Sequence, residues 1–413
     1  MKLFPYLFIP LIFFTLYFFY THTATSNDKP LLVVILMVKN EDAVMEATLK
    51  PFFDAGVQHY VVLDTGSTDQ TVATTLQLFE KYNIKHGHVC QKPFVDFSSS
   101  RNHALECAEE IFPDAVFFFM IDAEWYMHNV ESLLTFCDSE RNSKETTYMC
   151  KISNNLFTIY LNRLFRAHTG VEFIGKVHEC PNRISCSKIP DAYVLYQPSE
   201  NGRGKTNQRM YRDRDVLLQE HQNDPTNPRT VFFLAQTYEC LQDYPQACAW
   251  YHKRCAMSGG IETDFIAHYK LAGCYTASNN WKQGLKHYLK AFSMCPQKIE
   301  PLVQIAHHYM KTGNWPIVYL FAKHATKIPL PQQETIFIET IFYHLTRYEL
   351  LSLASWHVGE HEIGKQATLQ ALKYISESNY QKSSASLFSP EELQNNLAAF
   401  QAKLDQQSLK GNS

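Results

Sequence analysis

Two carboxylates, Asp122 and Glu124, follow the apolar run 117–121 and are separated by a single residue. Alternate side chains of a β-strand point to the same side, so both carboxylates could converge at the end of a strand. Carboxylate oxygens are preferred ligands of hard divalent cations, and a cation held there would bind a phosphate group. An isolated pair of this kind is more often a buried strand that runs into a solvated turn.

Two further polar clusters also follow apolar runs. Asn40 and Glu41 come after the run 31–38, and Asp64 ends the run 60–63. A carboxylate at the end of an apolar strand is costly unless a donor meets it, and the imide and ribose hydroxyls of a uridine nucleotide are suitable donors. Local structure could also account for part of these clusters, because Asn40 could cap a helix and the segment 67–70 fits a capping box.

The clusters lie in a region of alternating strand and helix patterns. Continuous apolar runs predict strands at 31–38, 60–63, 88–90 and 115–121, and a period of 3.6 residues predicts helices between them, the third at 99–111. Such strands indicate a parallel sheet covered on both faces, and ligands bind such sheets beyond the carboxyl ends of the strands. Arg101 opens the third helix, where a cation would meet a diphosphate.

Composition restricts the range of functions. The chain has 413 residues, of which 45% are hydrophobic and 14% aromatic, so it can form two or three domains with sizeable cores. The net charge is −3 and no basic run is present, which argues against nucleic acid as a partner.

Six segments in order resemble the family 2 glycosyltransferases of the GT-A fold, which is Rossmann-like with a mainly parallel sheet. The matching segments are V-K-N-E at 38–41, L-D-T-G-S-T-D-Q-T at 63–71, F-V-D-F-S-S-S-R-N-H-A-L at 94–105, I-D-A-E at 121–124, N-R-L-F-R at 162–166 and G-K-V-H-E at 175–179. The resemblance implies inverting transfer of a sugar from a nucleotide-sugar donor, usually a UDP-sugar, with Mn²⁺ or Mg²⁺ as cofactor.

The resemblance also implies roles for single residues. Nucleotide-sugar contacts fall on Asn40, Glu41, Asp64, Arg101 and Asp122, and the metal ligands fall on Asp122, Glu124 and His178. Glu179 becomes the base that deprotonates the acceptor. The family more often reads D-A-D-E where this sequence has Asp122-Ala123-Glu124, which changes the metal geometry. Alternatives stay open: Glu179 could pair with Lys176 or Arg183 at the surface, and His178 could only orient Glu179.

The second half of the chain carries an internal repeat. Leu234-Ala235-x-x-Tyr238 recurs at 271–275 and, with isoleucine first, at 305–309, at spacings of 37 (275 − 238) and 34 (309 − 275) residues. This pattern resembles tetratricopeptide repeats, which are stacked helix pairs. We therefore expect a sugar-transfer domain at 31–200, a connector helix at 201–228, helical repeats at 229–378 and a polar tail at 379–413. The combination resembles bacterial peptide S-glycosyltransferases, whose repeats serve subunit pairing or acceptor binding.

The first 30 residues are predicted to be a single membrane anchor or a secretory signal. Residues 4–20 contain no charge and reach the short limit for crossing a bilayer, and the residues near Ala24 form a poor cleavage site, which favours the anchor. Lys2 favours a cytoplasmic N-terminus, whereas eleven cysteines without a glycosylation sequon favour a reducing environment.

The sequence thus predicts a membrane-tethered, metal-dependent glycosyltransferase of the hexosyltransferase type. Its expected partners are a nucleotide-sugar donor, a glycan, lipid or protein acceptor, and a second copy or a protein bound through the repeats. The alternative is a catalytically silent sugar-nucleotide domain fused to a protein-interaction scaffold, which the altered metal motif and the large repeat region favour.

Overall fold

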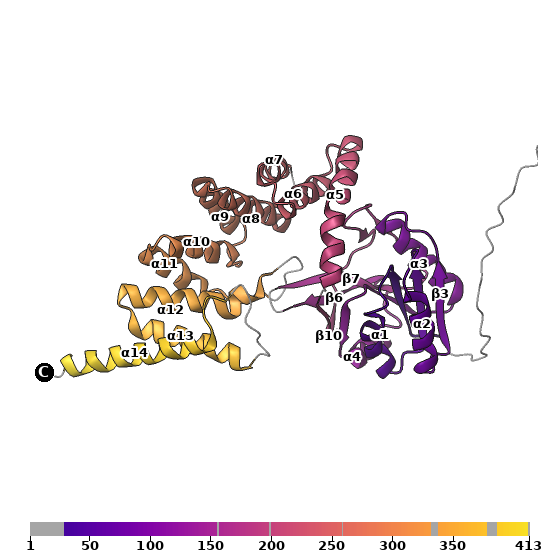
Figure 1. Cartoon of the computed structure of the whole chain (residues 1–413), viewed down its shortest axis with the longest axis horizontal. Coiled ribbons are helices and arrows are strands. Elements are labelled where there is room, and N and C mark those ends of the chain that lie inside the picture. The colour runs from indigo at the N-terminus through magenta and orange to yellow at the C-terminus, as the bar shows by residue number, and fades with distance from the viewer. Residues whose placement is uncertain are drawn as a thin grey trace, which may run out of the picture.

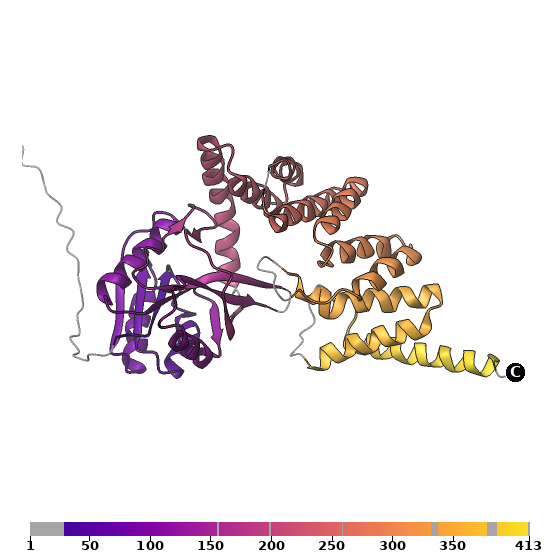
Figure 2. The same cartoon turned by 180° about the vertical axis from the view of Figure 1, so that it is seen from behind.

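A computed structural model describes residues 29–154, 157–197, 200–257, 259–331, 338–377 and 386–411. A sheet domain is followed by an array of helices that leaves it through one long helix and curves back toward it (Figures 1 and 2). The predicted anchor at 1–30 lies outside the described residues except for its last two. Among the residues described, no helix combines the length and apolarity needed to cross a bilayer.

The first half of the sheet is parallel. Its four strands lie in the order β3-β2-β1-β4, and β1, β2 and β4 are largely apolar whereas β3 has the sequence His-Gly-His-Val-Cys-Gln. All three pairings between them are parallel, as the sequence predicted. The bounds of these strands are β1 Leu32–Val38, β2 His59–Asp64, β3 His86–Gln91 and β4 Phe117–Ile121.

The second half makes the eight-stranded sheet mixed rather than mainly parallel. Strand β4 pairs with β7 in the antiparallel direction, β7 pairs likewise with β6, β6 is parallel to β10, and β10 is antiparallel to β5. The strands concerned are β5 Trp125–His128, β6 Thr147–Ser153, β7 Thr158–Arg166 and β10 Lys188–Tyr196. A separate hairpin, formed by β8 (Phe173–Ile174) and β9 (Cys180–Pro181), precedes β10.

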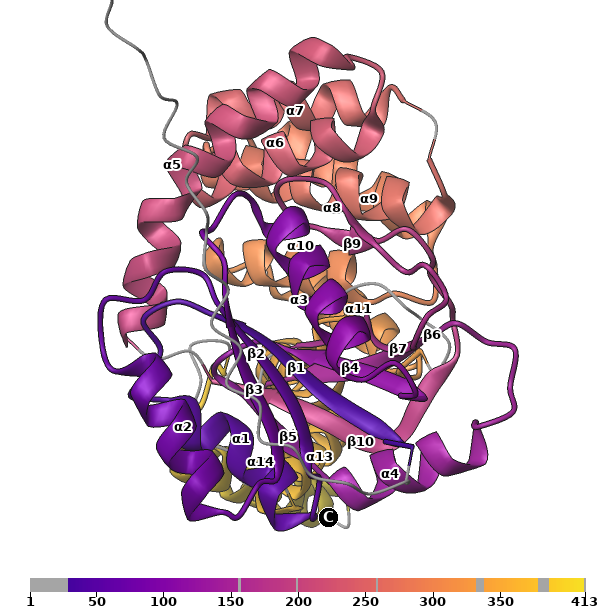
Figure 3. The ribbon, with the colours of Figure 1, turned by 90° about the vertical axis from the view of Figure 1, so that its right-hand side faces the viewer.

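Helices cover both faces of the sheet (Figure 3). One face packs on α1 (Met45–Asp54), α2 (Thr71–Lys81) and α4 (Val130–Ser139), through a core that includes Leu36, Phe52 and Leu133. The other face packs on α3 (Phe97–Ile111), whose Ala104, Leu105 and Ala108 meet alternate residues of β1 and β2. Because both faces of the sheet are covered here, β1 and β4 are apolar throughout and β2 carries polar groups only at its two ends.

Eight α-helices after the connector pack as four successive antiparallel pairs. The connector α5 spans Glu200–Asn223, and Ala235, Ala272 and Ala306 on the first helices of three pairs are fully buried. Small side chains at these positions let the paired helices approach closely, as the repeat pattern predicted. The pairs are α6 Pro228–Cys240 with α7 Tyr244–Cys255, α8 Ile261–Ala277 with α9 Trp281–Met294, α10 Glu300–Lys311 with α11 Trp315–Ala325, and α12 Arg347–Val358 with α13 His361–Glu377.

The array ends in one further helix, and its cysteines are free. Helix α14 (Pro390–Gly411) packs on α13 and buries Leu393 and Phe400, and a short π-helical segment, η1 (Phe342–Thr346), precedes α12. All eleven cysteines are free thiols, and Cys240 is exposed.

The helical array contacts the sheet domain at two places. Near its start, Leu217 of α5 and Leu234 of α6 form a small core with Val177 of the β8–β9 hairpin. Between the third and fourth helix pairs, Thr158 of β7 and Ile338 exchange two backbone hydrogen bonds of 3.2 and 3.3 Å. The two parts therefore meet at the start of the array and again just before its fourth helix pair.

Candidate functional site

Four charged side chains from four different segments meet beyond the carboxyl end of β4. Arg101 of α3 donates from Nη2 to Asp122 Oδ1 and from Nε to Glu179 Oε1, both at 2.6 Å. Arg163 of β7 donates from Nη2 to Asp122 Oδ2 at 3.2 Å. We call Arg101, Asp122, Arg163 and Glu179 the Arg101 cluster. Three of its members, Arg101, Asp122 and Glu179, were predicted from the sequence as site residues. The fourth, Arg163, belongs to the segment N-R-L-F-R.

The Arg101 cluster is largely shielded from solvent. The Arg101, Arg163 and Glu179 side chains are 5%, 8% and 10% exposed, whereas Asp122 is 27% exposed. Burial raises the pKa of Asp122, but the charges of Arg101 and Arg163 outweigh this effect and hold the pKa below its usual value. Burial and the neighbouring Arg101 lower the pKa of Arg163. Asp122 is therefore an ionised carboxylate held between two guanidinium groups.

Both arginines have a hydrogen-bond donor to spare. The Nη1 atoms of Arg101 and Arg163 are buried and have no hydrogen-bond partner among the described residues. A guanidinium presents five N–H donors and matches the oxygens of carboxylates and phosphates in pairs. Two unsatisfied donors beside one site suit an anionic ligand that carries several oxygens.

The prediction that Asp122 and Glu124 project to the same side of one strand is wrong. Strand β4 ends at Ile121, and Trp125 N donates to Asp122 O at 3.3 Å, which closes a turn over residues 122–125. Glu124 has a left-handed φ of 65°, and its backbone N–H donates to Thr48 Oγ1 at 3.2 Å. The two carboxylates therefore do not project as alternate residues of one strand.

The predicted metal ligands are not gathered into one set. No group of three His, Cys, Asp or Glu side chains within the described part of the chain is arranged to hold a metal ion. Asp122 is occupied on both oxygens by arginines, and the His178 ring stacks on Phe233 of α6 with centroids 4.1 Å apart. Asp122, Glu124 and His178 therefore do not form one ligand set in this structure, and their role as metal ligands stays a prediction.

His178 belongs to the contact with the helices. Burial, followed by the charge of Arg209, lowers the pKa of His178 to about 4, so the ring is neutral at physiological pH. The residue has a left-handed φ of 53°, and its carbonyl oxygen accepts a hydrogen bond from Arg229 of α6. The alternative role for His178, as a support of its neighbour Glu179, agrees better with these contacts than metal binding.

Three of the residues predicted to contact the nucleotide lie at the ends of β1 and β2, and hydrogen bonds connect the loops that follow these two strands. Asp64 is 2% exposed and accepts from Ser67 N at 3.1 Å and Gln91 Nε2 at 3.3 Å. Asn40 does not cap a helix, since α1 begins at Met45; its Oδ1 accepts from Thr68 N at 2.7 Å. Glu41 N donates to Thr71 Oγ1 at 2.8 Å. Asp64 thus has protein donors of its own.

The capping box predicted at 67–70 does not form. Helix α2 begins at Thr71 with Gln70 as an N-cap that makes no side-chain bond. Asp69 satisfies the helix start instead, because its Oδ1 accepts from Thr71 N at 3.0 Å. Ser67 Oγ accepts from Asn40 N at 2.8 Å, so the serine joins the loops after β1 and β2.

Sequence reasoning missed the residues that the helical array contributes. Arg229, Phe233 and Glu220 all contact the hairpin loop that carries Glu179. They lie some 40 to 60 residues further along the chain, in segments whose pattern indicates only helix. No local signal in the sequence could have identified them.

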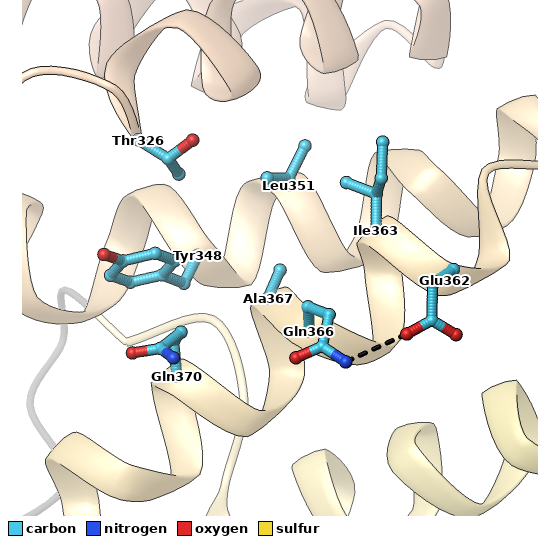
Figure 4. A pocket seen from close by; sticks show the side chains of 8 residues that line it. All are labelled: Thr326, Tyr348, Leu351, Glu362, Ile363, Gln366, Ala367 and Gln370. Atoms are coloured by element: carbon cyan, nitrogen blue, oxygen red, sulfur yellow. Dashed lines mark hydrogen bonds between the residues drawn. The ribbon is translucent and has the colours of Figure 1, made fainter.

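A pocket of about 230 Å³ lies elsewhere, between α11, α12 and α13 (Figure 4). Apolar groups of Leu351, Ile363 and Ala367 line much of it. Its single carboxylate, Glu362, accepts a hydrogen bond from Gln366 at 2.9 Å. Such a lining does not suit a charged nucleotide sugar, and none of these helices contributes to the Arg101 cluster.

The chain is similar to a known glycosyltransferase. Over 240 residues, 55% of this chain, it is 27% identical to the SPbeta prophage-derived glycosyltransferase SunS of Bacillus subtilis (strain 168) and equally to glycosyltransferase SunS of Bacillus phage SPbeta. The matched region covers 54% of each, so the chain spans about half the length of the curated relatives it matches. No protein-family model matches the chain.

Solved structures show weaker likeness. The mannosyltransferase PcManGT from Pyrobaculum calidifontis, solved with GDP-Man and Mn²⁺, is 16% identical with a TM-score of 0.37, over 64% of this chain and 88% of that one. MamA is 14% identical with a TM-score of 0.34, over 44% of this chain and 97% of its own. These scores are too low to support an argument about fold or function.

Proposed function

We propose that the protein is an inverting glycosyltransferase that moves a sugar from a nucleotide-sugar donor, with UDP-sugars as the first candidates, to an acceptor. The observation that carries the proposal is the meeting of Asp122 and Glu179 on Arg101 beyond the carboxyl end of β4. These residues are far apart in sequence, and the edge where they meet is where α/β sheets bind ligands. The similarity to SunS supports the same class of reaction.

Three residues of the Arg101 cluster, Glu179, Arg101 and Arg163, have a proposed task in this reaction. Glu179 accepts the proton of the acceptor group. The acceptor atom then bonds to the anomeric carbon, the bond from that carbon to the diphosphate oxygen breaks, and its electron pair leaves on the diphosphate. Arg101 and Arg163 supply the positive charge and the spare donors that stabilise the departing diphosphate.

Asn40, Glu41 and Asp64, with the two connected loops after β1 and β2, are proposed to bind the nucleoside part of the donor. These residues lie at the ends of β1, which neighbours β4 in the sheet, and of β2, which is the next strand beyond β1. A divalent cation stays a prediction from the family resemblance. Because the predicted ligands do not form a set, no step above depends on a metal.

The first experiment measures release of nucleoside diphosphate by the full chain from a panel of UDP- and GDP-sugars. The Glu179→Gln variant should bind the donor with unchanged affinity and lose transfer by about 100-fold, because an amide cannot accept the proton. Glu172→Gln is the matched control, since Glu172 is an exposed acid just before the same hairpin. Full transfer by Glu179→Gln would place the base elsewhere.

A silent sugar-nucleotide domain is the second candidate. The observation that favours it is the absence of a gathered metal-ligand set within the described residues. It predicts binding of UDP or GDP without turnover of any sugar nucleotide, and the same panel therefore separates the two candidates. Under either one, the helical array is proposed to bind an acceptor, a protein partner or a second copy.

The proposed location is a membrane surface, reached through the apolar segment 4–20. This proposal rests on the sequence alone. Retention of the full chain in the membrane fraction after alkaline carbonate extraction would support an anchor, and release into the supernatant would exclude it.

A further inference from the structure

The loop that carries Glu179 is held by helices that belong to the repeat array. The loop comprises residues 175–179 and joins β8 to β9. Two of its five residues have left-handed backbone angles, with φ values of 90° at Gly175 and 53° at His178. A non-glycine residue in this region is strained, and the surrounding structure must stabilise it.

The sheet domain holds the base of this hairpin. Asn102 of α3 accepts from Phe173 N at 2.7 Å and donates to Phe173 O at 3.0 Å. The ion pair between Arg101 and Glu179 fixes the other end of the loop. These contacts leave the three residues between Gly175 and Glu179 to be held from elsewhere.

Helices α5 and α6 provide that support, residue by residue. Lys176 N donates to Glu220 Oε1 at 3.3 Å, and Val177, which is 4% exposed, packs between Leu217 and Leu234. The contacts of the next residue, His178, are made by Arg229 and Phe233, one on the carbonyl oxygen and the other on the ring face.

Arg229 and Phe233 also support each other. The Arg229 guanidinium carbon lies 4.9 Å from the centroid of the Phe233 ring, a cation–π distance. Gly175 permits the approach of Arg229, because a Cβ at this glycine would lie 2.6 Å from Arg229 Nη1. The helix face and the loop are thus closely fitted to one another.

We infer that Arg229 and Phe233 of α6 are positioning residues for Glu179, so that the repeat array is part of the catalytic unit. This inference rests on the proposed function of Glu179. A base acts only within hydrogen-bond reach of the proton it removes, and displacement by about 1 Å can cost about 100-fold in rate. Loss of the His178 contacts frees the neighbouring Glu179 without touching its own side-chain partner.

The test uses the full chain with Phe233→Ala and Arg229→Ala. The contact between Thr158 and Ile338 keeps the two regions joined in both variants. Phe232→Ala is the matched control, because it removes a ring that packs inside the helical array against Tyr251 and that meets Phe233 only edge to face, 5.5 Å between centroids, while the Phe233 ring itself stays. Phe233→Tyr keeps the ring face and is the conservative variant.

The first readout is hydrogen exchange of peptides that cover residues 173–181. We expect faster exchange in Phe233→Ala and Arg229→Ala than in the wild type, and wild-type exchange in Phe232→Ala and Phe233→Tyr. Equal protection of this segment in Phe233→Ala and Phe232→Ala would overturn the inference. This readout needs no turnover, so it also decides whether α6 holds the loop if no sugar donor is a substrate.

The second readout is the kinetics of sugar transfer. Phe233→Ala should lower kcat by about tenfold or more while the donor KM changes by less than about twofold, and Phe233→Tyr should restore kcat. A kcat equal to that of Phe232→Ala would overturn the positioning role even if exchange is faster. Failure of the proposed function looks different, because the wild type would then turn over no donor although the loop is protected.

Discussion

At the scale of single residues, the site depends on the balance of charge around Arg101. Two guanidinium groups and two carboxylates lie together with little exposure to solvent, so each charge needs its partners. Removing one member of such a group usually costs more than the pair contributes, because the remaining charge is left buried and unpaired. The Arg101 cluster is therefore both a candidate site and a structural element of the sheet domain.

Asp122→Asn should destabilise the protein. The variant leaves Arg101 and Arg163 without the charge that both of them contact, while the amide keeps the shape of the side chain. We expect a loss of about 2 kcal/mol in the free energy of unfolding, in the range of hydrogen bonds to charged groups. The fall in Tm, measured by calorimetry or circular dichroism on the full chain, checks this value.

An exposed ion pair provides the control for this measurement. Asp138 pairs with Arg141 at 2.6 Å, but its side chain is 66% exposed. Pairs of this kind contribute about 0–1 kcal/mol, so Asp138→Asn should leave the Tm almost unchanged. Equal effects of the two variants would mean that the Arg101 cluster does not stabilise the fold.

At the scale of elements, the loop of the β8–β9 hairpin depends on exact backbone geometry, because Gly175 and His178 have left-handed angles. Gly175→Ala places a Cβ at a φ of 90° and at 2.6 Å from Arg229 Nη1. The left-handed conformation costs a residue with a Cβ about 1–2 kcal/mol, and the Arg229 guanidinium must leave its place against the loop. We expect a lower Tm together with a lower kcat.

Gly170→Ala separates backbone strain from the helix contact. Gly170 has a φ of 67°, but a Cβ there would meet only Arg183 Nη2, at 3.9 Å. Its substitution should lower the Tm by a similar amount and leave the kcat close to that of the wild type. If both variants lose kcat equally, the approach of α6 to the loop has no bearing on catalysis.

The elements that the sequence predicted well are those with one dominant pattern. The strands β1, β2 and β4 agree with the predicted runs within two residues at each end, because a strand buried on both faces is apolar throughout. The conformation of the polar residues at the strand ends was decided by tertiary contacts, which the local sequence does not show. The polar residues after β1 and β4 adopt left-handed conformations, at Asn40 and Glu124, and a D-x-E pattern cannot distinguish such a turn from a continuing strand.

The sequence predicted which residues belong to the site but not which of them pair with one another. Arg101, Asp122 and Glu179 were each identified, but their pairing depends on how α3, β4 and the hairpin pack in three dimensions. His178 shows the limit most clearly. Its environment is set by Phe233, a residue whose position in a helical pattern indicates only packing.

At the scale of the whole molecule, the helical array and the sheet domain are joined at two separate contacts. The first includes the loop of Glu179 and the second is the bridge between Thr158 and Ile338. The second contact has a partly buried carboxylate beside it, since Glu339 follows Ile338 in the chain. Glu339 accepts a hydrogen bond from the hydroxyl of Tyr269, and its backbone N–H donates to Glu300 Oε1 at 3.3 Å.

This arrangement predicts a dependence of stability on pH. Burial, with a smaller contribution from the neighbouring Glu300, raises the pKa of Glu339 from 4.5 to about 7, although Tyr269 and Lys270 oppose the shift. The folded chain then binds a proton that the unfolded chain has released between these pH values. The stabilisation that this group gives is fully present below about pH 4.5 and is lost as the pH rises through about 7.

Glu339→Gln should remove this part of the pH dependence, because glutamine is neutral at every pH and can still accept from Tyr269. The Tm of the variant minus that of the wild type should therefore increase as the pH is raised from 5 to 8. Glu360→Gln is the control, since that side chain is exposed to water before and after unfolding. A difference for Glu339→Gln that stays constant over this range would show that Glu339 is ionised throughout, and the contact beside it would then have to accommodate a buried charge.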